Sequence, residues 1–117
     1  MSPEHTGPPG TEGPELDPVL HHPTRLAVAA FLSACEEAEF RTVREHCRVS
    51  DSVLSKTASA LESAGYLDVR KGAVGRRHRT WLSLTDEGHD VLDAHLTALQ
   101  NIAAAAREAG SRAGGGT

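Results

Sequence analysis

The stretch from Ser50 to Thr85 constrains the fold of this 117-residue chain more than any other. It reads SDSVLSKTASALESAGYLDVRKGAVGRRHRTWLSLT, a helical pattern followed by two short strand patterns. Gly65 is expected to end the helix in a left-handed conformation, and later glycines relax a hairpin loop. That loop carries Arg76, Arg77 and Arg79. The sequence therefore predicts a helix followed directly by a basic hairpin, two elements that can make different contacts with one partner.

Helical periodicity and capping residues divide the segment before this stretch. Asp17-Pro18 predicts a short helix, which His22-Pro23 interrupts. A helix over 40–48 is expected to precede the constraining stretch. Another helix is expected from Thr24, with its apolar positions at Leu26, Ala27, Ala30, Phe31 and Ala34.

The constraining stretch also predicts its own boundaries. Its helix should begin at Ser50 or Asp51, because either side chain can accept a free N–H of the first turn. Strands are expected at 66–70 and 79–84, and Thr85 should cap a final helix. The buried stripe of the first helix is expected at Leu54, Ala58 and Leu61, with Val53 as a further candidate.

Charge is segregated along the chain, although the net charge is −4. Residues 41–79 hold nine Lys or Arg against four acids, whereas residues 1–20 hold four acids and no Lys or Arg. Such a basic segment favours an anionic partner in spite of the acidic total. Pro and Gly dominate residues 1–15, which are predicted as a disordered tail, and residues 110–117 are predicted as another. One domain is therefore expected at 16–109.

A helix–turn–helix is predicted where two helices meet at the tripeptide 48–50. The face of the second helix opposite its buried stripe carries short hydroxyl side chains and one lysine. Such a face can approach the floor of a DNA major groove closely. An ordinary solvated surface explains these residues equally well when they are taken by themselves. The expected DNA-reading residues are Asp51, Ser52, Ser55, Lys56 and Ser59.

The basic hairpin favours nucleic acid over a merely solvated loop. Six of the ten residues from Arg70 to Arg79 are Lys, Arg or His. Repulsion among these charges is relieved when an anion lies opposite, and arginine gains from the negative potential of a narrow minor groove. The DNA-binding residues expected here are Arg70, Lys71, Arg76, Arg77 and Arg79.

Three motifs in order carry a family resemblance: L-D-P-V-L-H-H-P-T-R-L, then L-S-K-x-x-x-x-L-E-x-A-G-Y-L, then G-R-R-x-R-T-W-L-S-L-T-x-x-G. From residue 16 to about residue 100 the chain resembles bacterial winged-helix transcriptional regulators of the MarR/ArsR-like group. The resemblance implies a homodimeric repressor or activator, under small-molecule control, with residues 51–59 in the major groove and the wing beside them. Thr57 and Ala58 depart from the His-Leu pair usual in relatives, which should thin the contact of this helix with the core.

Metal, cofactor and catalytic sites are not expected. His21 and His22 are adjacent and cannot both face one metal from a helix. The cysteine pair that ArsR-type metal sensors can carry at the start of the recognition helix would fall near Asp51, where this chain has no cysteine. Cys35 and Cys47 are expected as small, reduced, buried residues. No nucleophile elbow, phosphate loop or zinc-hydrolase motif appears. The chain shows no secretory leader or membrane-length apolar run, so a cytoplasmic location is expected.

The final helix carries an apolar stripe at alternating three- and four-residue steps, a pattern typical of helix association. The stripe could instead pack only on its own domain, as is expected for Val91 and Leu92. Beyond Leu96, however, a domain this small is not expected to cover three more turns, so the helix should pack on a second copy and form a two-fold dimer. The expected interface residues are Leu92, His95, Leu96, Leu99, Ile102, Ala103 and Ala106.

Taken together, the sequence predicts an α+β fold, mostly helical: a winged helix-turn-helix with a two-stranded wing and a C-terminal dimerisation helix. The predicted function is sequence-specific DNA binding as a homodimer on an inverted-repeat operator. The alternative is a winged-helix protein–protein interaction module that does not bind DNA. Arginine in the hairpin favours the first, because an interaction module would carry apolar or acidic residues there.

Overall fold

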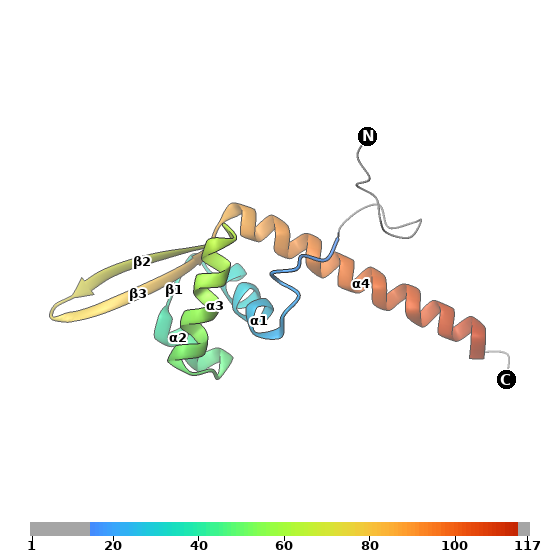
Figure 1. The fold of residues 1–117 in the computed structure, drawn as a ribbon, viewed down its shortest axis with the longest axis horizontal. Coiled ribbons are helices and arrows are strands. Elements are labelled where there is room, and N and C mark those ends of the chain that lie inside the picture. Colours follow the sequence, from blue (N-terminus) through green and yellow to red (C-terminus); the bar gives the residue numbers. More distant parts are fainter. Residues whose placement is uncertain (1–14, 115–117) are drawn as a thin grey trace.

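The computed structural model describes residues 15–114, and it confirms the α+β class with a projecting hairpin and a long final helix (Figure 1). Three short helices form a compact body, the hairpin β2–β3 extends from one side of it, and α4 extends from the other. The elements in chain order are α1 (Pro23–Ser33), β1 (Ala38–Glu39), α2 (Phe40–Cys47), α3 (Asp51–Ser63), β2 (Leu67–Val74), β3 (Arg77–Leu84) and α4 (Asp86–Gly114).

The sheet has a third strand that the sequence did not predict. Its order is β1-β3-β2, and all pairs are antiparallel. β1 is only two residues long, too short to show an alternating pattern, and it pairs with Trp81 and Leu82. The hairpin strands are longer than predicted, because residues 71–74 and 77–78 also pair and leave only a two-residue turn at Gly75-Arg76. Gly75 has φ +65°, as such tight hairpin turns require.

The predicted start and end of α3 and the predicted start of α4 are confirmed. The Ser50 hydroxyl accepts the N–H three residues later at 3.1 Å, which caps α3. Gly65 ends α3 with φ +85°, and the N–H of Tyr66 donates to the carbonyl of Leu61 at 2.9 Å across the helix end. The Thr85 hydroxyl accepts an N–H of the first turn of α4 at 2.9 Å.

The hydrophobic core is small and mostly aliphatic. In α1, the predicted apolar positions are partly wrong: Ala27 and Ala30 are exposed, whereas Val28 and Ala29 are buried. Residues 26–32 of this helix are all apolar, so periodicity could not decide which face turns inward. The buried hydrophobic residues with at most 1% of their surface exposed are Leu20, Val28, Ala29, Leu32, Val43, Leu54, Leu61, Leu67, Leu82 and Leu92.

The buried stripe of α3 is confirmed at Leu54, Ala58 and Leu61 but not at Val53, which is 42% exposed. Thr57 takes the buried place instead. Its hydroxyl donates to a backbone carbonyl one turn earlier at 2.8 Å, so the polar atom enters the core with a hydrogen bond. Val53 is left at the margin of the helix that faces solvent.

The short helix predicted at Asp17 is wrong. The Asp17 carboxylate accepts the N–H groups of Val19 and Leu20 at 3.0 Å each, as a helix cap does, but residues 18–20 form a turn that goes no further. His22 precedes Pro23 and is therefore held extended, with φ −155° and ψ 124°. That extended residue separates the turn from α1.

Part of the predicted C-terminal disordered tail is helical. Helix α4 continues to Gly114, so residues 110–114 are helical rather than part of a disordered tail. The alanine-rich sequence before them favours helix, and Arg112 forms an ion pair with Glu108 one turn earlier at 3.3 Å. The remainder of the two predicted tails, residues 1–14 and 115–117, lies outside the described residues.

Candidate nucleic-acid interface

The outward face of α3 presents a row of small polar side chains. Leu54 and Leu61 are completely buried on the opposite side and fix the orientation of the helix. The outward row is exposed from residue 52 to residue 59. This reading face consists of the exposed residues Ser52, Ser55, Lys56 and Ser59, all of which the sequence proposed as DNA contacts.

Asp51, the remaining predicted reading residue, has a partner inside the chain. Its carboxylate accepts a hydrogen bond from Arg44 of α2 at 3.1 Å, and Arg44 also lies 3.5 Å from Glu45. The pair links the two helices of the helix–turn–helix and offsets the negative charge at the start of α3. Between them, Arg48 adopts a left-handed conformation with φ 58°, which makes the turn tight.

The wing tip is defined as Arg76 and Arg77, and both residues are exposed to solvent. Lys71 is exposed farther down β2. Within residues 15–114, none of these three cations forms an ion pair. Their charge is therefore available to an external anion.

The wing root differs, because its first arginine is held by an acid and an aromatic ring. Arg70 donates to Glu37 at 2.6 and 3.3 Å, and its guanidinium lies 4.2 Å from the ring centroid of Trp81. The hydrogen bond to Glu37 raises the pKa of Arg70 above its ordinary value. Gly72 makes room for the indole, since a Cβ there would lie 3.2 Å from the Trp81 ring. The sequence did not reveal this arrangement.

The second arginine of the root is also paired. Arg79 donates to both carboxylate oxygens of Glu39, at 2.5 and 2.7 Å, and both side chains are about a third exposed. Glu39 belongs to β1, which the sequence did not predict. Of the five wing cations proposed as DNA contacts, Arg70 and Arg79 therefore already have carboxylate partners.

A hollow of about 630 Å³ lies between α3 and the wing, and residues of both predicted contact regions line it. Ser55 and Ser59 of the reading face line one side, and Lys71 lines the other. The only acid on its wall is Glu62, toward the end of α3. The reading face and the wing thus border one continuous concave surface.

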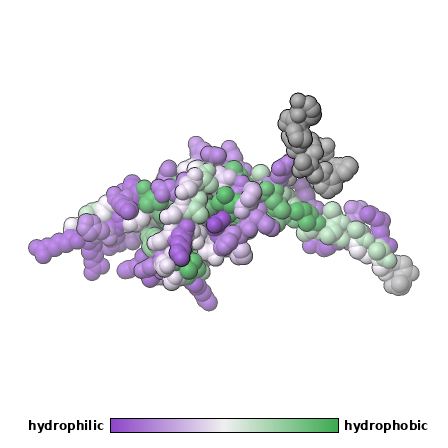
Figure 2. All heavy atoms as spheres, viewed as in Figure 1, coloured by the Kyte–Doolittle hydropathy of each residue, from purple (hydrophilic) through white to green (hydrophobic). Residues whose placement is uncertain are grey.

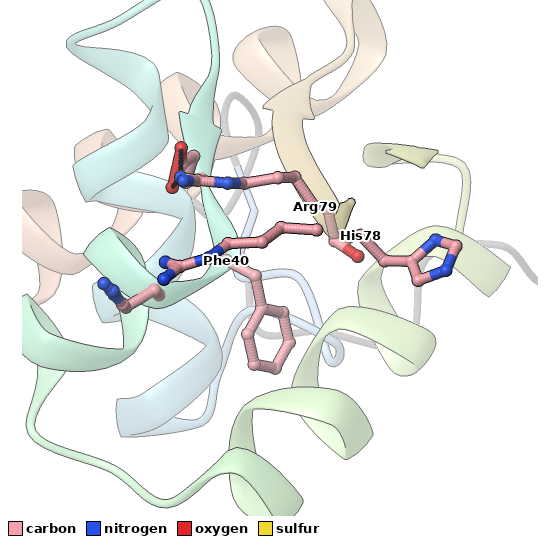
Figure 3. A pocket seen from close by; sticks show the side chains of 7 residues that line it. Phe40, His78 and Arg79 are labelled. Carbon is pink, nitrogen blue, oxygen red and sulfur yellow. Dashed lines mark hydrogen bonds and ion pairs between the residues drawn. The ribbon is translucent and has the colours of Figure 1, made fainter. Parts of the chain in front are cut away.

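A second, smaller pocket of about 260 Å³ lies where β3 passes the start of α2 (Figure 3). β1 pairs with β3 only at residues 81 and 82, so within the described residues the edge of β3 nearer the hairpin turn carries no strand on this side. The side chain of Arg79 runs across this edge, Phe40 projects along the wall, and the imidazole of His78 points away from both. The lining residues are Glu39, Phe40, Arg41, Arg77, His78, Arg79 and Thr80.

Two of the residues predicted at a dimer interface lie inside the single chain. Leu92 is 1% exposed and His95 is completely buried, so neither offers surface to a second copy, and this part of the prediction is corrected. His95 Nδ1 accepts the backbone N–H of Asp17 at 2.8 Å, and the carboxylate of Asp17 accepts the hydroxyl of Tyr66 at 2.7 Å. Desolvation is the main reason that the pKa of Tyr66 rises to about 12. The N-terminal segment thereby covers the first turns of α4.

The later turns of α4 remain uncovered. Leu96 is 36% and Ile102 is 53% exposed, and hydrophobic surface gathers along the projecting part of the helix (Figure 2). Leu99 and Ala103 are partly exposed, and Ala106 is exposed. The structure therefore leaves five of the seven predicted interface residues on one free stretch of helix.

The described residues contain no group of three His, Cys, Asp or Glu side chains that could hold a metal ion. Cys35 and Cys47 are free thiols, both half-buried, and burial raises the pKa of Cys47, which favours the unreactive thiol form. Over the same part of the chain, no helix combines the length and the apolar character needed to cross a membrane.

Comparison with solved structures identifies transcriptional regulators with this fold. A transcriptional regulator homologue from Pyrococcus horikoshii OT3 is 24% identical with a TM-score of 0.70, over 74% of this chain and 86% of that one. PcaV from Streptomyces coelicolor, solved with its natural ligand, is 31% identical with a TM-score of 0.59, over 66% of this chain. The zinc-responsive MarR family member ZitR from Lactococcus lactis is 19% identical with a TM-score of 0.53, over 76% of this chain and 60% of that one.

The present chain spans 54% of the length of PcaV. No curated protein matches it in sequence. A family model described as a winged helix DNA-binding domain matches residues 24–103, from the start of α1 well into α4. The match includes the helix–turn–helix and the complete wing, and the resemblance predicted from the sequence is confirmed. The chain belongs to the winged helix DNA-binding domain family and shares its fold with MarR-like transcriptional regulators.

Proposed function

We propose that this chain is a transcriptional regulator that binds operator DNA as a homodimer. In the proposed complex, α3 of each copy lies in the major groove and the wing tip contacts the adjacent backbone or minor groove. One observation carries the proposal: Ser55 and Ser59 of the reading face and the unpaired Lys71 of the wing border the same concave surface. The hydroxyls and Lys56 can reach base edges there, while Lys71, Arg76 and Arg77 can neutralise phosphates.

The free stretch of α4 supports the dimer. An apolar helix face with Ile102 more than half exposed is costly in water and is relieved by packing on a second copy. A two-fold dimer would carry two reading heads and should prefer an inverted-repeat operator with half-sites about one helical turn apart. Leu99→Asp places a charge in the proposed seam and should yield folded monomers with much weaker operator binding. Sedimentation at micromolar concentration checks this, and a dimeric Leu99→Asp variant would contradict it.

The DNA proposal is tested by recovering bound genomic fragments and measuring their affinity. We expect a shared inverted repeat among the fragments and tighter binding to it than to random duplex of equal length, by about a thousandfold or more. Lys56→Ala should cost roughly 1–3 kcal/mol with relaxed preference at one base pair if Lys56 contacts a base edge. Equal, weak affinity for all duplexes would instead favour the protein–protein interaction module.

Small-molecule control is a further part of the proposal. PcaV was solved with its natural ligand and ZitR is described as zinc-responsive, so proteins of this fold include ligand-responsive regulators. For this chain we propose an organic effector rather than zinc, because the described residues hold no suitable ligand group. As a DNA-binding regulator the protein would act in the cytoplasm and would catalyse no reaction.

A further inference from the structure

We infer that the pocket between β3 and α2 is a phosphate site, in which Arg41 and Arg77 hold one phosphate group supplied by the DNA backbone. This inference rests on the proposed function and deepens it, because it adds a contact from α2 to those from α3 and the wing tip. Arg41 is not among the residues that the sequence singled out. The site would bind phosphate irrespective of base sequence, so it would position the protein on DNA rather than select an operator.

The charges in the pocket support an anion. Three arginines line it against a single acid, Glu39, and that acid is already paired with Arg79. Arg41 and Arg77 are exposed, and neither forms an ion pair with any residue from 15 to 114. Two unpaired guanidiniums at one hollow suit a phosphate, because the N–H fork of each can bind two of its oxygens.

Backbone groups add donors at the same place. Every second residue of an antiparallel strand turns its N–H toward each side, and the edge of β3 between Arg77 and Thr80 lies beyond the reach of the two-residue β1. Helix α2 starts directly at the pocket wall, and its cap residue Glu39 makes no side-chain hydrogen bond to the first turn. The positive end of that helix therefore faces the same hollow as the arginines.

The position of the pocket indicates which phosphate it binds. Phe40 and Thr80 line both this pocket and the larger hollow beside α3, so the two adjoin. In the proposed complex the hollow faces the DNA between the major groove, read by α3, and the contact of the wing. The backbone separates the grooves, so a phosphate of that strand would lie at the junction of α2 and β3. A free phosphate ion would satisfy the same chemistry.

The test is the salt dependence of binding to a random duplex of about 20 base pairs, for which no operator is needed. Each lost phosphate contact lowers the slope of log affinity against log salt by about 0.9. Arg41→Gln should lower the slope by up to that amount per reading head, because Arg77 still faces the phosphate. The affinity lost between about 50 and 200 mM salt then becomes up to about three- to fourfold smaller for each head. Arg107→Gln, the matched control, removes the same charge from the far part of α4 and should leave the slope unchanged.

A titration of the full chain with inorganic phosphate, against chloride of equal ionic strength, separates the two sources. The readout is the Nε–H resonance of Arg77 in nitrogen-15 NMR. An unchanged slope in Arg41→Gln, together with a phosphate-specific shift in the wild type that is absent from the variant, would keep the site and assign it to free phosphate. A reduced slope assigns it to DNA. Circular dichroism verifies the fold of each variant.

The result that overturns the inference is an unchanged slope with no phosphate-specific shift. If Arg76→Ala still weakens DNA binding in that case, the proposed function stands without this site. If the wild-type chain binds no DNA at all, the proposed function fails, and the phosphate titration alone decides whether the pocket binds phosphate. The two failures are therefore distinguishable.

Discussion

The tip and the root of the wing carry the same type of side chain in opposite states. At the tip, Arg76 and Arg77 are exposed and have no acidic partner among the described residues. At the root, Arg70 and Arg79 each donate two hydrogen bonds to a carboxylate. A count of arginines along the hairpin cannot separate these states. The difference lies in two glutamates more than thirty residues away in the chain.

The two ends of the hairpin therefore have different roles. A root arginine that would contact DNA must first exchange its carboxylate for a phosphate, which cancels much of the electrostatic gain. Its present contacts instead connect β2 and β3 to the segment around β1, and stacking on Trp81 adds a second constraint on Arg70. The root therefore orients the wing, and the tip carries the charge that is available to an external anion.

The largest expected effect comes from removing the tip charges. Arg76→Ala with Arg77→Ala should weaken binding to every duplex by more than tenfold, because two phosphate contacts are lost from each reading head. The slope of log affinity against log salt should fall by about 1.8 per head, as measured by fluorescence anisotropy over a range of salt concentrations. The melting temperature should not change, since neither side chain has a partner within the described chain.

Arg70→Ala is the control for the tip variant, because it removes one positive charge from the same hairpin at the root. It should leave the salt slope nearly unchanged and lower the melting temperature slightly, through loss of the contacts with Glu37 and Trp81. Equal losses of slope in the tip and root variants would abolish the distinction between the two ends of the wing.

An intermediate effect is expected from releasing a root arginine. Glu39→Gln removes the carboxylate that holds Arg79, so a root arginine acquires the free charge of a tip arginine. Affinity for random duplex should rise several-fold and the salt slope should steepen by up to about 0.9 per head. Anisotropy titrations on one duplex compare the variant with the wild type. An unaltered slope would show that Arg79 cannot reach DNA even without its partner.

Local signals account for what the sequence predicted correctly. Ser50, Gly65 and Thr85 act within a few residues of their own positions, and each ends or begins a helix as expected. The hydroxyl row on α3 follows from helical geometry once Leu54 and Leu61 are assigned to the core. Such features depend on spacing along the chain, which the sequence states directly.

Features that depend on tertiary contacts were not predictable in the same way. The partners of Arg70 and Arg79 become visible only when β1 is placed beside β3. His95 continues the apolar spacing of α4 and was assigned to the dimer stripe, yet the turn at Asp17 covers it. The phosphate-site arginine Arg41 gave no signal, because its role depends on the open edge of a strand that is distant in sequence.

The smallest expected effect concerns His95, a histidine whose ionisation is suppressed by burial. His95 is completely buried, and its Nδ1 accepts the N–H of Asp17, which fixes the proton of the neutral ring on Nε2. That second nitrogen has no hydrogen-bond partner among the described residues. Desolvation lowers the pKa of His95 below its ordinary value of 6.5, nearby His21 lowers it further, and Asp17 partly opposes both.

The sign of the resulting pH dependence follows from proton binding. Below about pH 6.5 the unfolded chain binds a proton at His95 that the folded chain excludes, so the free energy of unfolding falls as the pH falls and levels off below the folded pKa. Urea titrations from about pH 7.5 to about pH 5.5 should therefore show a decreasing midpoint. His95→Asn keeps an acceptor for Asp17 without a titrating ring and should reduce this decrease. The same decrease in both proteins would mean that groups other than His95 cause it.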